Sequence, residues 1–570
     1  MNSVHTMICC GHGMNRENAP MQDFRRRALI KATAASLGAL SLRGFSVEAH
    51  ASAHFTHGIA SGDPLADRVI LWTRVLPGDG ISAPLQCQWQ VAEDVNFDRL
   101  VVQGETSAVP ERDFTVKVDA TGLQPHKRYY YRFLVGDQVS PTGRTQTLPV
   151  GAVEQFRLAV ASCSNYPQGY FHAYRDIADA DVDAVLHLGD YIYELPAGVY
   201  ANPIAEQELG RIVVPQHELL ALEDYRMRYG LYRTDPDLQA AHAAHPWITV
   251  WDDHELANNT WHNGAENHNA GEGDFQARMA AARTAYHEWL PIRTAAQTDQ
   301  GPIYRNFKIG DLADLIMLDT RLVGRDEQLE YNRDITPEQG VEQFLQRLNA
   351  PDRQMLGLDQ EMWLANQLAA SVDRGAIWQV LGQQILMGSS RMPGIPSEEL
   401  ATLDLPDWAR PRIEAGQRLA GQGLPLNLDA WDGYPAARSR LFRLLTELAS
   451  NPVSVAGDTH NAWAFNLTDG DGQPVGVEIG TPGISSPGLE SYLPLPAKRM
   501  AELMRENSDG LLYTDTSRRG WTEVTLTPET LTAQWRFVSS VLEPIYSVDK
   551  SPELIARVNK RQFVTSAPGD

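Results

Sequence analysis

The stretch from Val160 to Glu194 constrains the fold of this chain more than any other. It opens with the end of an apolar run that leads into polar residues 162–165, and a second apolar run ends at Asp190. Three apolar residues at helical spacing lie between the two runs: Phe171, Tyr174 and Ile177. The pattern predicts a βαβ unit. Because ligands bind at the carboxyl ends of strands in open α/β sheets, Cys163 and Asp190 are expected side by side at a site.

Cys163, Asp190 and Tyr193 together offer a thiol, a carboxylate and a phenol, which is a set typical of metal ligands. Taken singly, a cysteine at a strand end is more often a small core residue, and an aspartate after glycine is often a turn former. The metal interpretation is favoured because later strands repeat the arrangement.

Four later apolar runs also end in polar or charged residues. They lead into 252–255 (Asp-Asp-His-Glu), 319–321 (Asp-Thr-Arg), 382–384 (Gly-Gln-Gln) and 457–461 (Gly-Asp-Thr-His-Asn). Six such strand ends indicate one shared site, and the strand–helix alternation predicts an α/β catalytic domain over residues 150–570. Within this domain, residues 521–538 are expected at a sheet edge, and the tail from Ser551 is expected to begin as a helix.

Residues 54–149 are predicted to form a separate β-sandwich domain, because short alternating or apolar runs are divided by turn residues. Leu123, Pro125 and Tyr129 have the spacing of a tyrosine corner. Cys87 falls within one of these strands and is expected to be plain core.

Residues 1–53 are predicted to be a signal peptide, since a basic segment, an apolar run and small residues follow in that order. Arg26 and Arg27 with Lys31 resemble a twin-arginine signal, which predicts export to the periplasm or beyond by the twin-arginine machinery. The apolar run is too short for a signal anchor, and translation starting at Met14 or Met21 is an open alternative. No transmembrane helix is expected in the mature chain. The net charge of −23 argues against nucleic acid as a partner, and we expect a monomer.

The residue types at the strand ends suggest particular metals. Asp190 is the natural bridge between two ions, while Cys163 and Tyr193 as anions favour Fe³⁺, with His460 completing that side. The oxygen donors of Asp253, Asn258 and Asp458 suit Ca²⁺. Two further side chains have catalytic rather than ligand chemistry: His254 can protonate a leaving group, and Arg321 can hold a phosphate.

The chain resembles the PhoD-type alkaline phosphatases. The matching stretches are 55–64 (Phe-Thr-His-Gly-Ile-Ala-Ser-Gly-Asp-Pro), 163–165, 189–194, 251–255 with Asn258, 318–321 and 457–461. The resemblance implies a ferric ion with calcium ions and the hydrolysis of phosphate monoesters and diesters. It also implies twin-arginine export and a four-layer α/β/β/α catalytic domain behind an immunoglobulin- or fibronectin-like sandwich. Cys163 and Asp458 depart from the purple acid phosphatases, which also carry the Gly-Asp-x-x-Tyr motif.

Several roles stay open at this stage. Asp252 and Asp253 compete for one ligand position, His254 is either catalytic or a neighbour of the ligands, and Arg321 has the alternative of pairing with Asp319 or another carboxylate. Glu255 and Asn461 are expected to be structural. The leading function is a secreted phosphatase that uses a metal-bound oxygen as nucleophile. The alternatives are a phospholipase D-like phosphodiesterase and a non-enzymatic calcium-binding surface protein.

Overall fold

The computed structural model describes residues 54–564 except 79–82, 294–300, 336–339, 392–393, 403–421, 423 and 494. The signal peptide predicted for residues 1–53 lies outside the described residues. Within the described part, no helix is long and apolar enough to cross a membrane.

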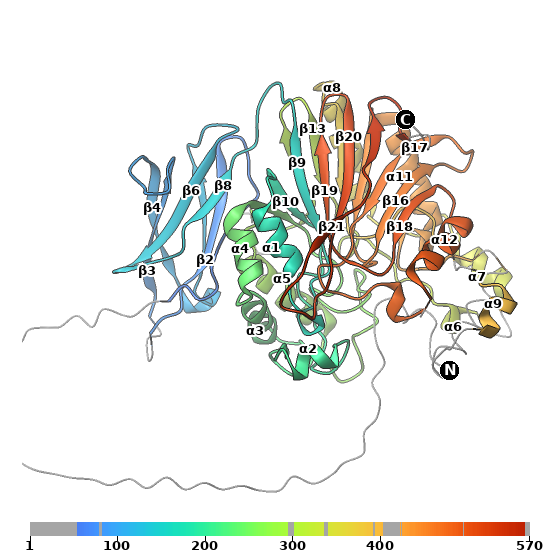
Figure 1. Ribbon diagram of the computed structural model, residues 1–570, viewed down its shortest axis with the longest axis horizontal. Coiled ribbons are helices and arrows are strands. Elements are labelled where there is room, and N and C mark those ends of the chain that lie inside the picture. The colour runs from blue at the N-terminus through green and yellow to red at the C-terminus, as the bar shows by residue number, and fades with distance from the viewer. Residues whose placement is uncertain are drawn as a thin grey trace, which may run out of the picture.

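Two large sheets pack face to face in the middle of the molecule (Figure 1). The first runs in the order β23 (Phe563–Val564), β22 (Leu554–Arg557), β20 (Thr530–Val538), β19 (Arg519–Leu526), β9 (Phe156–Ala161), β10 (Ala184–His187), β11 (Pro246–Thr249), β1 (Ile59–Gly62), β2 (Arg68–Arg74), β5 (Thr115–Thr121), with β21 (Val548–Lys550) beside β20. The second runs β12 (Arg305–Ile309), β13 (Ala313–Met317), β14 (Trp378–Gly382), β15 (Pro452–Ala456), β17 (Pro474–Gly480), β16 (Ala462–Thr468), β18 (Leu511–Asp515). Apolar side chains of both sheets, such as Leu158 and Val453, share one buried core.

Helices cover the outer faces of both sheets. The first sheet carries α1 (His172–Asp179), α3 (Leu222–Tyr232), α4 (Pro236–Ala244) and α5 (Phe275–Trp289). The second carries α8 (Leu358–Asp373), α11 (Pro435–Leu448) and α12 (Ala497–Asn507). Further helices lie in the connections: α2 (Pro203–Gln207), α6 (Tyr331–Asp334), α7 (Gly340–Leu348) and α9 (Ser397–Thr402). The arrangement is the expected four-layer α/β/β/α fold.

A sandwich packs at the far end of the first sheet. Its outer sheet consists of β4 (Leu100–Ala108), β3 (Leu85–Ala92), β6 (Arg128–Val135), β7 (Gln138–Val139) and β8 (Gly143–Gln146), and it faces β1, β2 and β5 across a separate core that includes Cys87. The predicted tyrosine corner is confirmed, because the Tyr129 hydroxyl accepts a hydrogen bond of 2.8 Å from the Gln124 backbone N–H. Through the parallel pairing of β1 with β11, the sheet runs unbroken across the predicted boundary near residue 150.

Two expectations for the C-terminal part were wrong. Residues 521–538 are not at a sheet edge, because β19 pairs with β9 and β20 pairs onward with β22. The tail does not begin as a helix, because residues 554–557 pair with β20 and become strand β22. The edge of β20 presents unpaired backbone N–H and C=O groups. Hydrogen bonds to these groups stabilise residues 554–557 as a strand more than local helix formation would stabilise them as a helix.

The βαβ unit at the start of the α/β part forms as predicted. β9 and β10 run parallel, with Ala161 opposite His187, and α1 crosses between them. Two positions after the end of β10, Gly189 has φ 101°, and a Cβ at this position would lie 2.4 Å from the Asp252 backbone nitrogen. Glycine is therefore required where the ends of β10 and β11 meet, and this close approach brings Asp190 beside Asp252.

Candidate metal centre

The strand ends of both sheets bring their polar side chains together in one buried cluster. Cys163 follows β9, Asp190 follows β10, and the residues from Asp252 onward follow β11; Arg321 follows β13, and Asp458 with His460 follows β15. The loops after β9 and β10 are joined directly, since the Cys163 backbone N–H donates to the Gly189 carbonyl over 3.1 Å.

All of the predicted site residues lie in this cluster, and none is more than 2% exposed. They are Cys163, Asp190, Tyr193, Asp253, His254, Asn258, Arg321, Asp458 and His460. Three groups have ligand atoms close enough to share an ion: Cys163–Asp190–His460, Asp190–Asp253–His254 and Asp252–Asp253–Asp458. Asp190 belongs to the first two groups and Asp253 to the last two, so the carboxylates form a continuous chain across the cluster.

Six buried polar atoms in this cluster have no hydrogen-bond partner among the described residues. They are Asp190 Oδ1, Asp252 Oδ2, Asp253 Oδ1, His254 Nε2, Asn258 Oδ1 and Asp458 Oδ2. Leaving one such atom unsatisfied costs about 1–3 kcal/mol, so six in one place require another occupant. Five of the six are oxygens, which suits a hard cation. The donor set therefore fits bound metal ions.

The thiol and the phenol lie on one side of the cluster. The Tyr193 hydroxyl is 3.0 Å from Asp190 Oδ2, 3.4 Å from His460 Nε2 and 2.7 Å from Ser486 Oγ. Burial and the negative charge of Asp190 raise the pKa of Cys163 and of Tyr193 well above their usual values. Both groups are therefore neutral unless a bound cation stabilises their anions, as ligation by a ferric ion would.

The backbone at four of the predicted ligand positions is strained. Cys163, Asp190, Asp458 and His460 have φ between 56° and 62°, in the left-handed region that residues other than glycine rarely adopt. Each residue held in this conformation lowers the stability of the folded state by about 1–3 kcal/mol. Strain of this kind is retained at functional sites, where the surrounding structure enforces it.

Arg321 lies among the carboxylates and is fully buried. Its Nε is 2.5 Å from Asp252 Oδ1, Nη1 is 2.8 Å from Asp429 Oδ2, and Nη2 is 3.3 Å from Asp458 Oδ1. Asp319, the pairing alternative named above, instead accepts from the Arg321 backbone N–H over 2.9 Å.

The charges of the cluster are strongly coupled. Burial, together with repulsion among the carboxylates, raises the pKa of Asp252 and of Asp458, although Arg321 acts in the opposite direction. Burial also opposes ionisation of Asp253, but Arg321 and His254 outweigh it and lower the pKa of that carboxyl to about 2. Asp253 is therefore the stronger candidate for an anionic ligand, while Asp252 is held by Arg321.

Glu194 is a residue of this site to which the sequence patterns assigned no role. It is fully buried and accepts hydrogen bonds from His254 Nδ1 over 2.7 Å, from the Asn258 backbone N–H over 2.8 Å and from Asn267 Nδ2 over 2.8 Å. Burial disfavours the charged imidazole, but Glu194 and Asp253 prevail and raise the pKa of His254 well above its usual value. The proton on Nε2 then faces the cluster.

Other carboxylates and hydroxyls support the cluster from behind. Glu255 accepts from the backbone N–H groups of Asp190, Tyr191 and Asp252 over 2.6–3.0 Å, which is the structural role expected for it. Glu266 accepts from the side-chain amide of Asn258 over 3.3 Å, which turns the Asn258 carbonyl away from Glu266. Sequence reasoning missed Glu266, Asp429, Ser486 and Tyr200, since none of them lies at the end of an apolar run.

Known proteins are similar to this chain over most of its length. A family model described as PhoD-like phosphatase matches residues 158–535, and one described as PhoD-like phosphatase, N-terminal domain, matches residues 41–149. Alkaline phosphatase D of Bacillus subtilis (strain 168) is 35% identical over 560 residues, which cover 93% of this chain and 87% of that protein. A solved structure of PhoD superposes with a TM-score of 0.74 at 32% identity and covers 93% of this chain and 95% of its own.

Proposed function

The chain belongs to the PhoD-like phosphatase family and is a phosphoric ester hydrolase, and on that premise we propose that it is an exported phosphatase that hydrolyses phosphate monoesters and diesters with ferric iron and calcium. One observation supports metal dependence above the others: six buried donor atoms converge without hydrogen-bond partners among the described residues. The twin-arginine route of export and the division into a sandwich domain (54–149) and a catalytic domain (150–570) belong to the same proposal.

Each predicted ligand has a place in this proposal. Cys163, Asp190, Tyr193 and His460 would hold the ferric ion, and Asp253, Asn258 and Asp458 would hold calcium, with Asp190 between the two sets. When bound, the ions would neutralise charge on the phosphate oxygens and activate the attacking water. Cys163 and His460 share a group with Asp190 but not with Asp253 or Asp458, which supports two different ions.

The Glu194–His254 pair provides the acid of the reaction. Glu194 holds the imidazole by Nδ1 and keeps it charged, so Nε2 carries a proton that no described residue accepts. This proton passes to the oxygen of the departing alcohol as its bond to phosphorus breaks. A positioned acid of this kind contributes about 10²–10⁴-fold to the rate.

In this proposal, Arg321 forms ion pairs with carboxylates of the cluster. Its contacts with Asp252, Asp429 and Asp458 engage every nitrogen of the guanidinium. It partly compensates the negative charge of the cluster and binds one carboxylate oxygen of Asp252, Oδ1. Direct contact between Arg321 and the phosphate stays a prediction from the sequence.

Metal content and activity test the proposal together. Protein purified from the exporting cell is analysed for metals and assayed with phenyl phosphate and bis(4-nitrophenyl) phosphate. Both activities should disappear when the metals are removed and return with Fe³⁺ and Ca²⁺. Asp190→Asn should lose bound metal and activity, whereas Glu478→Gln, a buried carboxylate in β17 away from the cluster, should keep both. Full activity in metal-free protein would disprove metal dependence.

A further inference from the structure

A short segment after β17 packs against one side of the metal centre, and we call residues 483–487 (Gly-Ile-Ser-Ser-Pro) the support segment. Its backbone N–H groups donate hydrogen bonds of 3.0–3.4 Å to the carbonyl oxygens of Ser162, Cys163 and His460. Two of these residues are predicted ligands, and the third directly precedes one of them. The proposed reaction assigns no role to the support segment.

The last residue of the support segment fixes the tautomer of His460. The Pro487 carbonyl oxygen lies 2.8 Å from His460 Nδ1. A carbonyl oxygen only accepts, so Nδ1 carries the proton and Nε2 keeps its lone pair. Nε2 lies 3.4 Å from the Tyr193 hydroxyl and 3.9 Å from Asp190 Oδ2. The lone pair is therefore on the side of the predicted ligands, as metal binding requires.

The Ser486 side chain connects the support segment to the phenol of Tyr193. Its Oγ is fully buried and lies 2.7 Å from the Tyr193 hydroxyl. The two other groups at this hydroxyl, Asp190 Oδ2 and His460 Nε2, are predicted ligand atoms without a proton to donate. Once Tyr193 binds the ion as a phenolate, its oxygen can only accept, so Ser486 is the donor in this contact.

Cys163 has a matching contact with another serine. The Ser162 Oγ lies 3.1 Å from Cys163 Sγ, and both side chains are fully buried. A thiolate has no proton, so Ser162 is the donor in the ligated state. Each of the two anionic ligands proposed for the ferric ion therefore faces one serine hydroxyl.

These contacts belong to one side of the metal centre. The hydrogen bonds described for the support segment reach Cys163, Tyr193 and His460 but none of the proposed calcium ligands. Hydrogen bonds to ligand atoms change how strongly these atoms donate electrons, and such bonds are known to set the reduction potentials of iron centres. A redox-inactive calcium ion has no comparable property to adjust.

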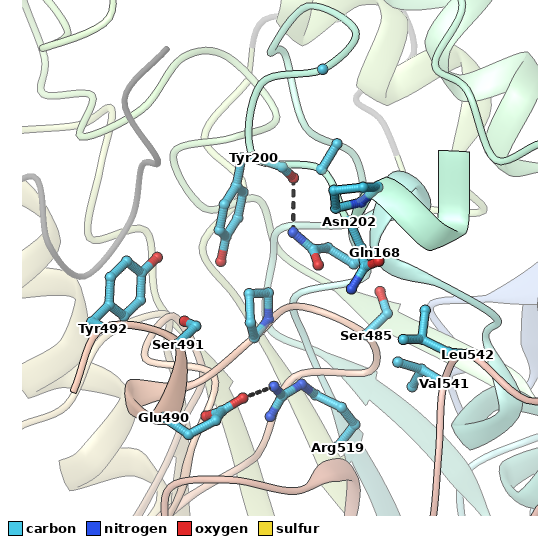
Figure 2. A pocket seen from close by; sticks show the side chains of 14 residues that line it. Gln168, Tyr200, Asn202, Ser485, Glu490, Ser491, Tyr492, Arg519, Val541 and Leu542 are labelled. Carbon is cyan, nitrogen blue, oxygen red and sulfur yellow. Dashed lines mark hydrogen bonds and ion pairs between the residues drawn. The ribbon is translucent and has the colours of Figure 1, made fainter. Parts of the chain in front are cut away.

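The other side of the support segment lines a pocket of about 590 Å³ (Figure 2). Ser485 and Pro487 belong to the lining of this pocket, whereas Ser486 between them does not. The Ser485 hydroxyl donates to the Asn165 carbonyl oxygen over 2.8 Å. Two adjacent buried serines thus form one hydrogen bond each, and of the two Ser486 is the one that reaches a predicted ligand. Ser485 is therefore a matched control for Ser486.

We propose that Ser162 and Ser486 are positioning residues that donate hydrogen bonds to the Cys163 thiolate and the Tyr193 phenolate and thereby tune the ferric ion. This inference rests on the proposed function, since it takes ferric iron as the metal held by these ligands. A donated hydrogen bond withdraws electron density from the ligand atom and weakens its donation to iron. The ion then keeps more positive charge for the phosphate oxygens, and its reduction potential is higher than it would be without the two serines.

Ser486→Ala and Ser162→Ala test the inference in metal-loaded protein from the exporting cell. Loss of a donor raises the energy of the ligand electrons, so the charge-transfer band should move to longer wavelength and the reduction potential of the iron should fall. Resonance Raman spectra excited in this band separate the two ligands. Ser486→Ala should change the phenolate vibrations, and Ser162→Ala should change the iron–sulfur vibrations. Ser485→Ala should keep the spectrum and the potential of the wild type.

The outcomes distinguish this inference from the proposed function. An unchanged spectrum and potential in one alanine variant would exclude that serine, and in both variants would overturn the inference while the phosphatase proposal stands. An equal shift in Ser485→Ala would also overturn it, because the cause would then be the packing of the support segment. Wild-type protein that binds no iron would refute the ferric site itself, and the inference would fail with it.

A measurement on the wild type covers the case in which neither alanine variant retains iron. The protons that the two serines donate are exchangeable, so transfer of the wild-type protein into D₂O should shift the phenolate and the iron–sulfur vibrations. Vibrations that stay the same after complete exchange would overturn the inference.

Discussion

Replacing Glu194 with glutamine should convert His254 from an acid into a neutral hydrogen-bond donor. Asn258 N–H and Asn267 Nδ2 both donate to Glu194 Oε1, while His254 Nδ1 faces Oε2. The glutamine carbonyl can keep the first two hydrogen bonds, which leaves its NH₂ group facing Nδ1. The imidazole must then accept at Nδ1 and carry its one proton on Nε2. A neutral imidazole is far too weak an acid to protonate an alkoxide.

The size of the effect follows from these contacts. Breaking a buried ion pair by removing one partner costs about 3–5 kcal/mol of stability, and the two retained hydrogen bonds place this variant near the lower limit. Because Glu194 raises the pKa of His254 in the folded protein, the stabilisation is complete below the usual histidine pKa near 6.5 and disappears as pH rises through the raised value. The pKa of the Glu194 carboxyl is lowered, so its stabilisation is lost again in strong acid, and the stability difference between wild type and Glu194→Gln should be largest in mild acid, between the ordinary pKa values of glutamate and histidine, and should shrink at alkaline pH.

Leaving-group dependence is the decisive assay. Esters of simple alcohols need protonation of the departing oxygen, so their kcat should fall about 10²–10⁴-fold in Glu194→Gln. Nitrophenyl esters leave without a proton and should change little. Glu478→Gln, which neutralises a buried carboxylate away from the site, controls for general destabilisation. Equal losses on both kinds of ester, or none on either, would refute the assignment of His254 as the acid.

Four further outcomes are expected. Ligation of Fe³⁺ by Cys163 and Tyr193 should give the pure protein a visible charge-transfer absorption band. Tyr193→Phe should shift or bleach this band and reduce activity. A colourless, fully active enzyme that contains only zinc would exclude this iron site. A calcium-selective chelator should stop turnover, and Ca²⁺ but not Zn²⁺ should restore it, because the second site is rich in oxygen donors; indifference to chelation would exclude calcium there. Replacing Arg26 and Arg27 with lysine should leave the precursor in the cytoplasm, since the twin-arginine receptor recognises the guanidinium pair, and normal export measured by cell fractionation would point to another route. Hydrolysis of an ester with chirally labelled phosphate should invert the configuration at phosphorus, as in a single displacement by water, whereas net retention would indicate a phosphoenzyme.

The sequence was most informative where local patterns carry long-range consequences. An apolar strand that ends in a polar residue places that residue where the carboxyl ends of the strands meet, whichever strands become its neighbours. Cys163, Asp190, Asp253, Asp458 and His460 could therefore be assigned to one site before their neighbours were known, and the structure brings them together. The tyrosine corner was predictable for a similar reason, because it depends on the spacing of a few nearby residues.

Residues that reach the site from loops carried no such signal. Asp429 lies more than 100 positions from Arg321, and Tyr200 reaches His460 from a connection without regular structure. Glu194 lay within a recognised motif, but its function depends on the distance to His254, which no spacing reveals. The strand identity of the tail was hidden for a related reason, since it depends on the free edge of β20.

Gly189 shows how a local signal and a long-range contact combine in this site. A glycine stands immediately before Asp190 in the sequence, and a turn at this position would be a sufficient reason for it. The structure supplies the additional reason: the backbone of Asp252 approaches so closely that any side chain would collide with it. Both carboxylates then lie within one buried cluster, although they come from different strands. Crowded carboxylates repel each other, and the cations of the site, which are Arg321, His254 and the proposed metals, make their proximity stable. The glycine at position 189 is therefore a requirement of the proposed metal site, even though glycine donates no ligand.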